Sequence, residues 1–314
     1  MIINKADPKL DNLGIRFVNS IKKGVRMMIE DILDLHWFFW TVMLTLAVLL
    51  AVNSLVNWQF IISGKKSEML GPWIWQSKNG WNFATVMSVV SVISVVTGVV
   101  CVVLLMNRKV TNFFWGAFNV CLIGLSAIST NTWLNFQNMF FYIFPINVYS
   151  YFHWKKELGE FKGESRDIKP GKLDKFQWVM LAYVWALLTI FLYFESAGLS
   201  YFFDKGGVQT GTSAITRRIF DAISTSIFIC AQTLALFKKR EQYALWLLSD
   251  VFLILLWGPW KFVHDGQWDF STFNLMFMYL LYFGTAINGL ILWFLPHLKL
   301  YRSHHHHQIK ETVN

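Results

Sequence analysis

Asp250 stands within an otherwise apolar stretch, 243–260, four residues after Trp246. Residues four apart share one face of an α-helix, so the carboxylate and the indole would point the same way. A charged side chain that faced lipid at the middle of a membrane helix would cost about 2.5–3.5 kcal/mol or more. We therefore expect Asp250 to face a polar interior, where it could bind a cation or accept hydrogen bonds from hydroxyl groups.

Other apolar stretches carry further polar and aromatic groups, including Trp115 and Asn119, which are also four residues apart. Amides donate and accept hydrogen bonds, and a desolvated contact between a cation and an aromatic ring can contribute about 2 kcal/mol. This mixture predicts a site for a flat, cationic heterocycle that carries a sugar. The predicted substrate-binding residues are Trp246, Asp250, Trp115, Asn119, Gln232, Asn288, Tyr243 and Asn274.

The sequence gives no pattern for a metal site, a cofactor or hydrolytic chemistry. The run His304 to His307 is close to the end of the chain, and we interpret it as a solvated tail or a cloning remnant. No glycine-rich loop that could cradle phosphate is present, and no paired acid and base groups are expected at one depth. We therefore expect a protein that is not an enzyme; a membrane-embedded enzyme or sensor without a transport cycle is the alternative class.

The composition is that of an integral membrane protein. Of 314 residues, 55% are hydrophobic and only 15% are charged, against about 25% charged in soluble proteins. The net charge of +9 resides in the connections, which indicates membrane topology and not nucleic-acid binding. The three cysteines fall inside apolar stretches, so we expect no disulfides. The first apolar run begins at about His36, which is too late and too long for a cleavable signal peptide.

Eight stretches have nearly the length and hydropathy of a transmembrane helix, which needs about 20 apolar residues. They are 36–56, 82–106, 112–129, 138–154, 177–194, 216–237, 243–260 and 271–295. With eight spans and a cytoplasmic N-terminus, 21 of the 28 Lys and Arg residues lie on the inner side. Because cytoplasmic loops are enriched in these residues, we predict that both termini are cytoplasmic.

Before the first span, apolar residues recur every three or four positions from Val18 to Ile32, with basic residues between them. This spacing predicts an amphipathic helix lying on the lipid surface. The expected segments are a cytoplasmic amphipathic lead-in at 1–35, an additional first transmembrane helix at 36–56, a three-helix repeat at 81–154, a cytoplasmic loop and linker helix at 155–194, a second three-helix repeat at 216–295 and a cytoplasmic tail at 296–314.

The two repeats are inferred from matching sequences. Residues 104–120 align with 235–251 at an offset of 131, and 135–154 align with 274–293 at an offset of 139. The alignment pairs Trp115 with Trp246, Asn119 with Asp250, and Trp154 with Trp293. Three helices followed by one linker helix return the chain to the same side, so the repeats would be parallel. A site near the membrane midplane between them is the expectation for such a transporter fold.

The stretch 217–250, with its basic turn and its Trp-x-x-x-(Asn/Asp) pattern, resembles the core of the PnuC-type vitamin transporters over about 81–295. That family has a Trp-x-x-Trp-x-x-x-(Asn/Asp) signature; here Trp246 and Asp250 match it, and Tyr243 replaces the first tryptophan. The first copy keeps Trp115 and Asn119.

The resemblance implies an all-α membrane protein with a SWEET-like core of three, one and three helices, assembled as a homotrimer in the inner membrane. It implies uptake of nicotinamide riboside by facilitated diffusion with alternating access, followed by trapping through a cytoplasmic kinase. The same scaffold transporting thiamine, riboflavin or a nucleoside is one alternative, and proton-coupled vitamin transport is another. The implied partners are the small-molecule substrate and the lipid bilayer, with no cofactor and no nucleic acid.

Overall fold

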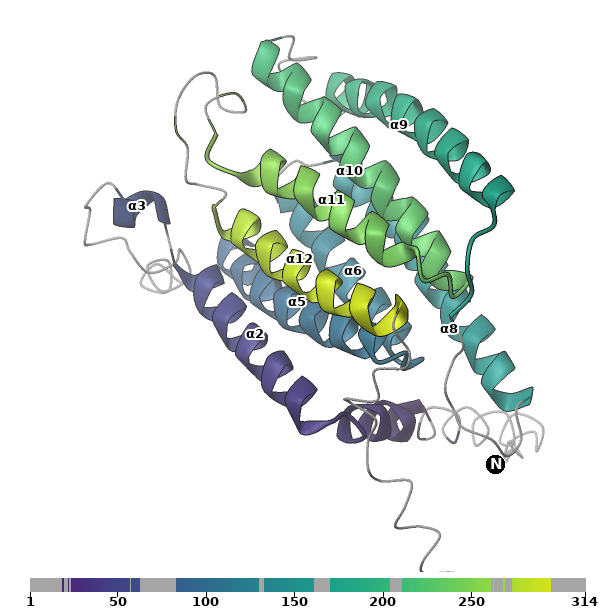
Figure 1. The fold of residues 1–314 in the computed structure, drawn as a ribbon. Helices are drawn as coiled ribbons and strands as arrows, with labels where there is room; N and C mark the ends of the chain where they lie inside the picture. The colour runs from purple at the N-terminus through teal and green to yellow at the C-terminus, as the bar shows by residue number, and fades with distance from the viewer. Residues whose placement is uncertain are drawn as a thin grey trace, which may run out of the picture.

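A computed structural model describes residues 19, 22, 24–56, 58–62, 83–129, 133–160, 170–203, 211–260, 262, 268 and 273–294. The elements of this part of the chain are helices (Figure 1). They are α2 (Trp37–Leu55), α3 (Trp58–Ile62), α5 (Phe83–Met106), α6 (Asn112–Ser129), α7 (Trp133–Gln137), η3 (Asn138–Ile143), α8 (Phe144–Glu160), α9 (Lys175–Phe203), α10 (Thr212–Leu236), α11 (Gln242–Trp257) and α12 (Phe273–Phe294). The tail at 296–314, with His304 to His307, lies outside the described residues.

Helices coincide with all of the predicted apolar stretches, but length and hydropathy qualify fewer of them as membrane spans. Within the described residues, three helical segments are long and apolar enough to cross a membrane: Lys175–Leu199, Thr212–Leu236 and Leu275–Phe294. A fourth is added if Gly24–Leu33 and Trp37–Asn53, which meet at a bend of 103°, form one span. Segments such as Val92–Met106 and Gln242–Trp257 are apolar but shorter. The count of eight spans therefore stays a prediction.

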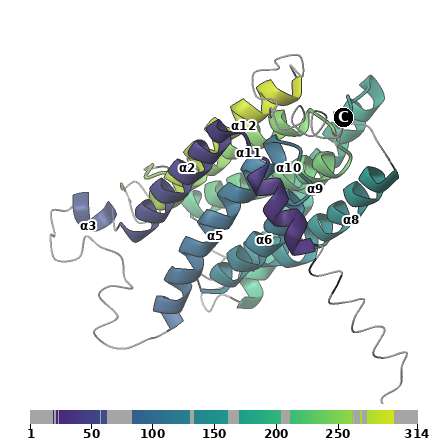
Figure 2. The same ribbon diagram turned by 90° about the horizontal axis from the view of Figure 1, so that it is seen from below.

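The helices form two sets of neighbours. In the first triplet, α5 packs on α6, and α6 packs on α7, η3 and α8; in the second triplet, α10 packs on α11, and α11 packs on α12. The triplets meet where α12 contacts α5 and where α8 contacts α10. Helix α2 covers α5 and α12 on one side of the bundle, and α9 covers α7 and α10 on the other (Figures 1 and 2). The first helix of each triplet thus packs against the last helix of the other triplet.

Two tryptophans join the triplets at the end of the bundle where α5 and α10 finish. The indole of Trp154 in α8 donates to the carbonyl of Leu236 at 2.9 Å, and that of Trp293 in α12 donates to the carbonyl of Met106 at 3.3 Å. Both tryptophans are almost fully buried. Each therefore satisfies a carbonyl at a helix C-terminus, where the helix itself supplies no N–H donor.

The turns after α5 and α10 have the same backbone form. Arg108 and Lys238 adopt left-handed φ angles of 58° and 55°, which lets the following residue, Lys109 or Lys239, donate its N–H back into the helix. The Arg108 guanidinium lies 5.4 Å from the ring of Trp293, and the Lys238 ammonium lies 5.8 Å from that of Trp154. Partial burial lowers the pKa of Lys238 from its ordinary value.

These contacts set the register between the first two helices of each triplet at 130 residues, as shown by the pairs Met106 with Leu236 and Arg108 with Lys238. The middle of the helices agrees: Asn119 donates to the carbonyl of Ser94, and Ser249 donates to that of Ser224 at 3.2 Å. The predicted offset of 131 is therefore wrong by one residue, because it aligned identical tryptophans and not equivalent backbone contacts. In the structure Asn119 corresponds to Ser249, and Asp250 corresponds to Val120.

Each of the two turns is anchored by a segment from outside the triplets. In the first, the hydroxyl of Thr111 donates to the Asp31 carboxylate at 2.8 Å. In the second, the carboxylate of Glu241, 130 residues further on, accepts from the backbone N–H of Leu173 at 3.1 Å. The described part of the predicted lead-in, 24–33, is helical and is thus attached to the protein through Asp31, while its Val25 and Ile29 are exposed.

Candidate functional site

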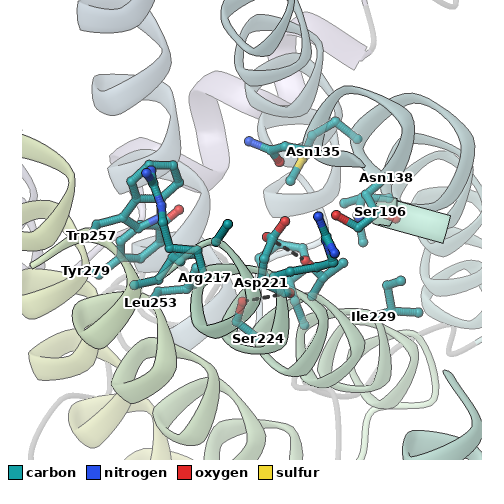
Figure 3. A pocket seen from close by; sticks show the side chains of 17 residues that line it. Asn135, Asn138, Ser196, Arg217, Asp221, Ser224, Ile229, Leu253, Trp257 and Tyr279 are labelled. Carbon is teal, nitrogen blue, oxygen red and sulfur yellow. Dashed lines mark hydrogen bonds between the residues drawn. The ribbon is translucent and has the colours of Figure 1, made fainter. Parts of the chain in front are cut away.

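A cavity of about 260 Å³ lies between α10 and the ends of the helices around it. Its polar lining comes from several elements (Figure 3). These residues are Asn135 of α7, Asn138 of η3, Ser196 of α9, Arg217, Arg218, Asp221, Ser224 and Thr225 of α10, and Tyr279 of α12. Leu253 and Trp257 of α11 add apolar wall. The cavity is slightly smaller than most pockets that bind small molecules, which measure about 300–1,000 Å³.

Two opposite charges line the cavity from one face of α10. Arg217 and Asp221 are four residues apart, so helix geometry places them one above the other. Their charges are close enough to interact, and Thr225, four residues further on, places its hydroxyl 3.5 Å from Asp221. Arg217 is exposed and Asp221 is partly buried. A cationic group is thus held at the cavity mouth and an anionic group further along the helix.

The opposite wall is shaped by a π-helical turn, η3. Its backbone bonds span five residues, as in the N–H of Phe144 donating to the carbonyl of Met139. Pro145 follows directly and has no N–H, which prevents the usual α-helical bond to Phe141. The wider turn leaves Asn138 facing the cavity with 1% exposure. π-turns inside helices are frequent at functional sites.

Asp250 lies next to this cavity. It is 6% exposed and, among the described residues, has no ion-pair partner. Leu253 and Trp257, three and seven residues further along α11, share its helix face and line the cavity. Tyr279 lies close enough to both Asp250 and Asp221 for an electrostatic interaction with each carboxylate. Tyr279 therefore connects the cavity to Asp250, which faces the protein interior as predicted.

The polar groups continue from Asp250 toward the first triplet. Tyr282 is one turn along α12 from Tyr279 and is also close enough to Asp250 for an electrostatic interaction. The hydroxyl of Tyr282 lies against Gly98 in α5. A Cβ at Gly98 would overlap this hydroxyl and would come within 3.2 Å of the Asn119 amide nitrogen. The absence of a side chain at Gly98 thus lets the hydroxyl and the amide approach each other. The polar residues form a track across the interface between α12 and α5.

The structure places Gln232, Trp246 and Trp115 inside the bundle. Gln232 is buried and donates to the side-chain oxygen of Asn147 at 2.9 Å. Trp246 contacts the ring of Phe228, which lines the cavity, edge-on at 4.7 Å. The indole nitrogens of Trp246 and Trp115 are buried without a hydrogen-bond partner in the described residues. Buried donors of this kind call for a water or a ligand.

None of the eight predicted residues is part of the described cavity lining, and Tyr243, Asn288 and Asn274 have no described contact with a residue that lines it. Tyr243 is 2% exposed and lies near the turn end of α11, where its ring packs on Trp293 at 5.5 Å and touches Gly289. Asn288 is exposed on α12. The side chain of Asn274 lies outside the described residues. The predicted set is therefore spread along the bundle and is not a single cluster.

Asp221, Asn138 and Arg217 are the cavity residues that our sequence analysis did not assign to a site. Two spacings point to them: Arg217 and Asp221 are four apart in a predicted span, and Asn135 and Asn138 are three apart where the span 138–154 begins. Either spacing puts both polar groups on one helix face. Charges and amides enclosed between apolar helices define a membrane protein whose interior accommodates a small polar solute, the arrangement of a transporter.

Comparison with known proteins agrees with this class. The model of the nicotinamide mononucleotide transporter family matches residues 88–295. The chain is 25% identical over 199 residues to the nicotinamide riboside transporter PnuC of Neisseria mucosa, covering 62% of this chain and 68% of that protein. It is 28% identical over 162 residues to PnuC of Haemophilus influenzae, covering 51% of this chain and 65% of that protein. The matches thus span about two thirds of the length of these relatives.

A crystal structure of the vitamin B3 transporter PnuC superposes with a TM-score of 0.51 at 21% identity, covering 82% of this chain and 97% of that one. This likeness supports the helical fold. The chain belongs to the nicotinamide mononucleotide transporter family, whose members are membrane transporters and not enzymes.

Proposed function

We propose that the protein takes up nicotinamide riboside by facilitated diffusion with alternating access. The relatives that match it are nicotinamide riboside transporters. The observation that carries the proposal is the burial of Asp250, 6% exposed, beside two phenol groups and without an ion-pair partner in the described chain. A buried carboxylate of this kind needs a partner, and a cationic ring can supply one.

In this proposal Trp246 and Trp115 stack on or support the ligand, and Asp250 balances the pyridinium charge or accepts from ribose hydroxyls. Asn119, Gln232 and Asn288 complete the polar lining, and Tyr243 and Asn274 also bind the substrate. Support comes from the unpartnered indole nitrogens of Trp246 and Trp115 and from the polar track between α12 and α5. The two triplets would move relative to each other around this track.

We extend the proposal to the setting of transport. The protein would cross the inner membrane eight times with both termini in the cytoplasm, built on the three-one-three core and assembled as a homotrimer. A cytoplasmic kinase would phosphorylate the nucleoside, and the added phosphate would prevent its return. The count of basic residues on each side supports the orientation, and the remaining points follow from the family resemblance.

Counterflow of radiolabelled nicotinamide riboside into proteoliposomes tests the proposal. Unlabelled nicotinamide riboside should compete, whereas thiamine, riboflavin, uridine and nicotinamide mononucleotide should compete less. Asp250→Ala should abolish binding measured by calorimetry. An unchanged affinity would show that Asp250 is not part of the binding site. If only thiamine or a nucleoside competed with the labelled compound, that competitor would be the substrate in place of nicotinamide riboside.

Proton coupling with Asp250 as the proton carrier is the second candidate, because one acid, Asp221, lines the cavity and another, Asp250, is buried in the next helix. A carboxylate that exchanges a proton during transport would make uptake depend on the proton gradient. Facilitated diffusion predicts that a protonophore leaves the initial uptake rate unchanged. A collapse of uptake on adding the protonophore would favour proton coupling.

A further inference from the structure

Asn138 is a buried polar side chain whose hydrogen bonds the described chain does not supply. It is 1% exposed, and neither its amide nitrogen nor its amide oxygen has a partner among the described residues. A buried amide without partners loses free energy relative to water, and such groups are rare in native proteins. Because Asn138 lines the cavity, the missing donor and acceptor belong to whatever occupies that cavity.

Asp221 lines the same cavity from α10, so the occupant meets a carboxylate as well as the amide (Figure 3). The nearby Arg217 does not cancel this charge inside the cavity. Arg217 is exposed, where solvent screens its charge, whereas interactions of buried charges are screened much less. Arg218 is half-buried and also lines the cavity, but its guanidinium is held toward α9, where it lies 5.9 Å from the ring of Tyr193. With Asp250 close behind Tyr279, the enclosed part of the site favours a cation.

An amide edge offers one donor and one acceptor side by side, which matches another carboxamide. We propose that Asn138 and Asp221 determine specificity in this transporter: the Asn138 amide pairs with a primary carboxamide, and Asp221 pairs with a positive charge on the same flat ring. This inference rests on the proposed function and deepens it. The ligand class is a cationic N-heterocycle bearing a carboxamide, in preference to its uncharged or carboxylate-bearing analogues.

The contribution of Asp221 is tested with two ligands that differ in charge. Full-length protein purified in detergent is titrated calorimetrically with nicotinamide riboside and with its reduced, uncharged form. Asp221→Asn should weaken binding of the cationic form about tenfold or more and change binding of the reduced form less than about threefold. Asp221→Glu should restore much of the difference. Equal losses for both ligands would mean that Asp221 has only a structural role and would overturn this assignment.

The contribution of Asn138 is tested with two ligands that differ at the carboxamide. Wild-type protein should prefer nicotinamide riboside to nicotinic acid riboside, and Asn138→Leu should reduce the ratio of the two affinities about tenfold. Asn53→Leu is the matched control, because Asn53 is 5% exposed and its side chain accepts from Trp58 in a part of the bundle away from the cavity. An unchanged ratio in Asn138→Leu contradicts the proposal.

The wild-type titration distinguishes a failure of the proposed function from a failure of the assignment of Asn138 and Asp221. If wild-type protein does not bind nicotinamide riboside, the proposed function fails and this inference fails with it. If wild-type protein binds but both variants keep the wild-type ligand preferences, only the assignment of Asn138 and Asp221 is wrong. Thermal unfolding of each variant in the same detergent shows that the protein titrated is folded.

Discussion

The first triplet, α5 to α8, and the second, α10 to α12, share their contacts at the turns but differ where they face the polar interior. At the turns, Trp154 and Trp293 make the same bond to the end of the other triplet's first helix. In the interior, the second triplet carries Asp221 and Asp250, whereas the positions 130 residues earlier are Ser91 and Val120. The shared contacts join the two halves, and the unshared charges indicate that the second half contributes the ionic part of recognition.

Around Asn119 in the first triplet, the polar side chains bond one another. The Asn119 amide is 3.2 Å from the hydroxyls of both Ser94 and Thr97 and also donates to the Ser94 carbonyl. In the second triplet the corresponding Ser249 bonds the backbone, and the neighbouring Asp250 has no ion-pair partner in the described chain. Around these corresponding positions the amide of the first triplet is satisfied within the protein, whereas the acid of the second triplet is left for a ligand.

The shared tryptophan contacts should have the largest effect on stability and should be equal in the two copies. Trp154→Ala and Trp293→Ala each remove a fully buried ring and an indole donor, so each should cost about 3–5 kcal/mol. Trp178→Ala, at a site that is 43% exposed on α9, is the control and should cost well below that. The readout is the midpoint of thermal unfolding in detergent; a marked inequality between the first two variants would show that the two tryptophan contacts are not equivalent.

A contact in the second triplet should come next. A Cβ at Gly289 would overlap the ring of the buried Tyr243, so Gly289→Ala should destabilise by about 1–3 kcal/mol. Gly284→Ala in the same helix meets no atom within 4 Å, and it should be neutral or stabilising because alanine favours the helix. Unfolding midpoints distinguish the two, and similar midpoints would show that α12 shifts to accept the new methyl group.

The anchoring of the lead-in helix should matter less. Thr111→Val keeps the shape of the fully buried Thr111 but removes its bond to Asp31, at a cost of about 1 kcal/mol. Thr216→Val is the control, because the Thr216 hydroxyl bonds the carbonyl of Thr212 in its own helix. Protease cleavage near residues 24–33 should accelerate in Thr111→Val alone. Equal cleavage of both variants would mean that Asp31 does not hold the helix in place.

The sequence alone was sufficient to predict the helical class, the burial of Asp250 and the equivalence of Trp154 and Trp293. Apolar periodicity and a single acid in an apolar stretch carry that information directly. The offset of the first two helices was wrong because side-chain identity guided it, whereas the backbone turns at Arg108 and Lys238 decide it.

Asn138 was not predicted as a site residue, for a different physical reason. Its orientation depends on the π-turn that precedes Pro145, and a regular helical wheel does not contain that turn. Asp221 was present as an acid in a predicted span, but our sequence analysis did not assign it a role. Whether Asp221 and Arg217 enclose a cavity depends on the packing of α7, α9 and α12 around α10, which no local pattern encodes.

The smallest effect is expected on the exposed side of the lead-in helix. Arg26 and Glu30 form an ion pair at 2.7 Å, with the Arg26 side chain 81% exposed. Exposed pairs four apart on a helix contribute about 0.5 kcal/mol or less, so Arg26→Ala should leave the unfolding midpoint and the protease sensitivity of 24–33 close to wild type. A loss as large as that of Thr111→Val would show that this helix is held by its exposed charges as much as by its buried bond to the first triplet.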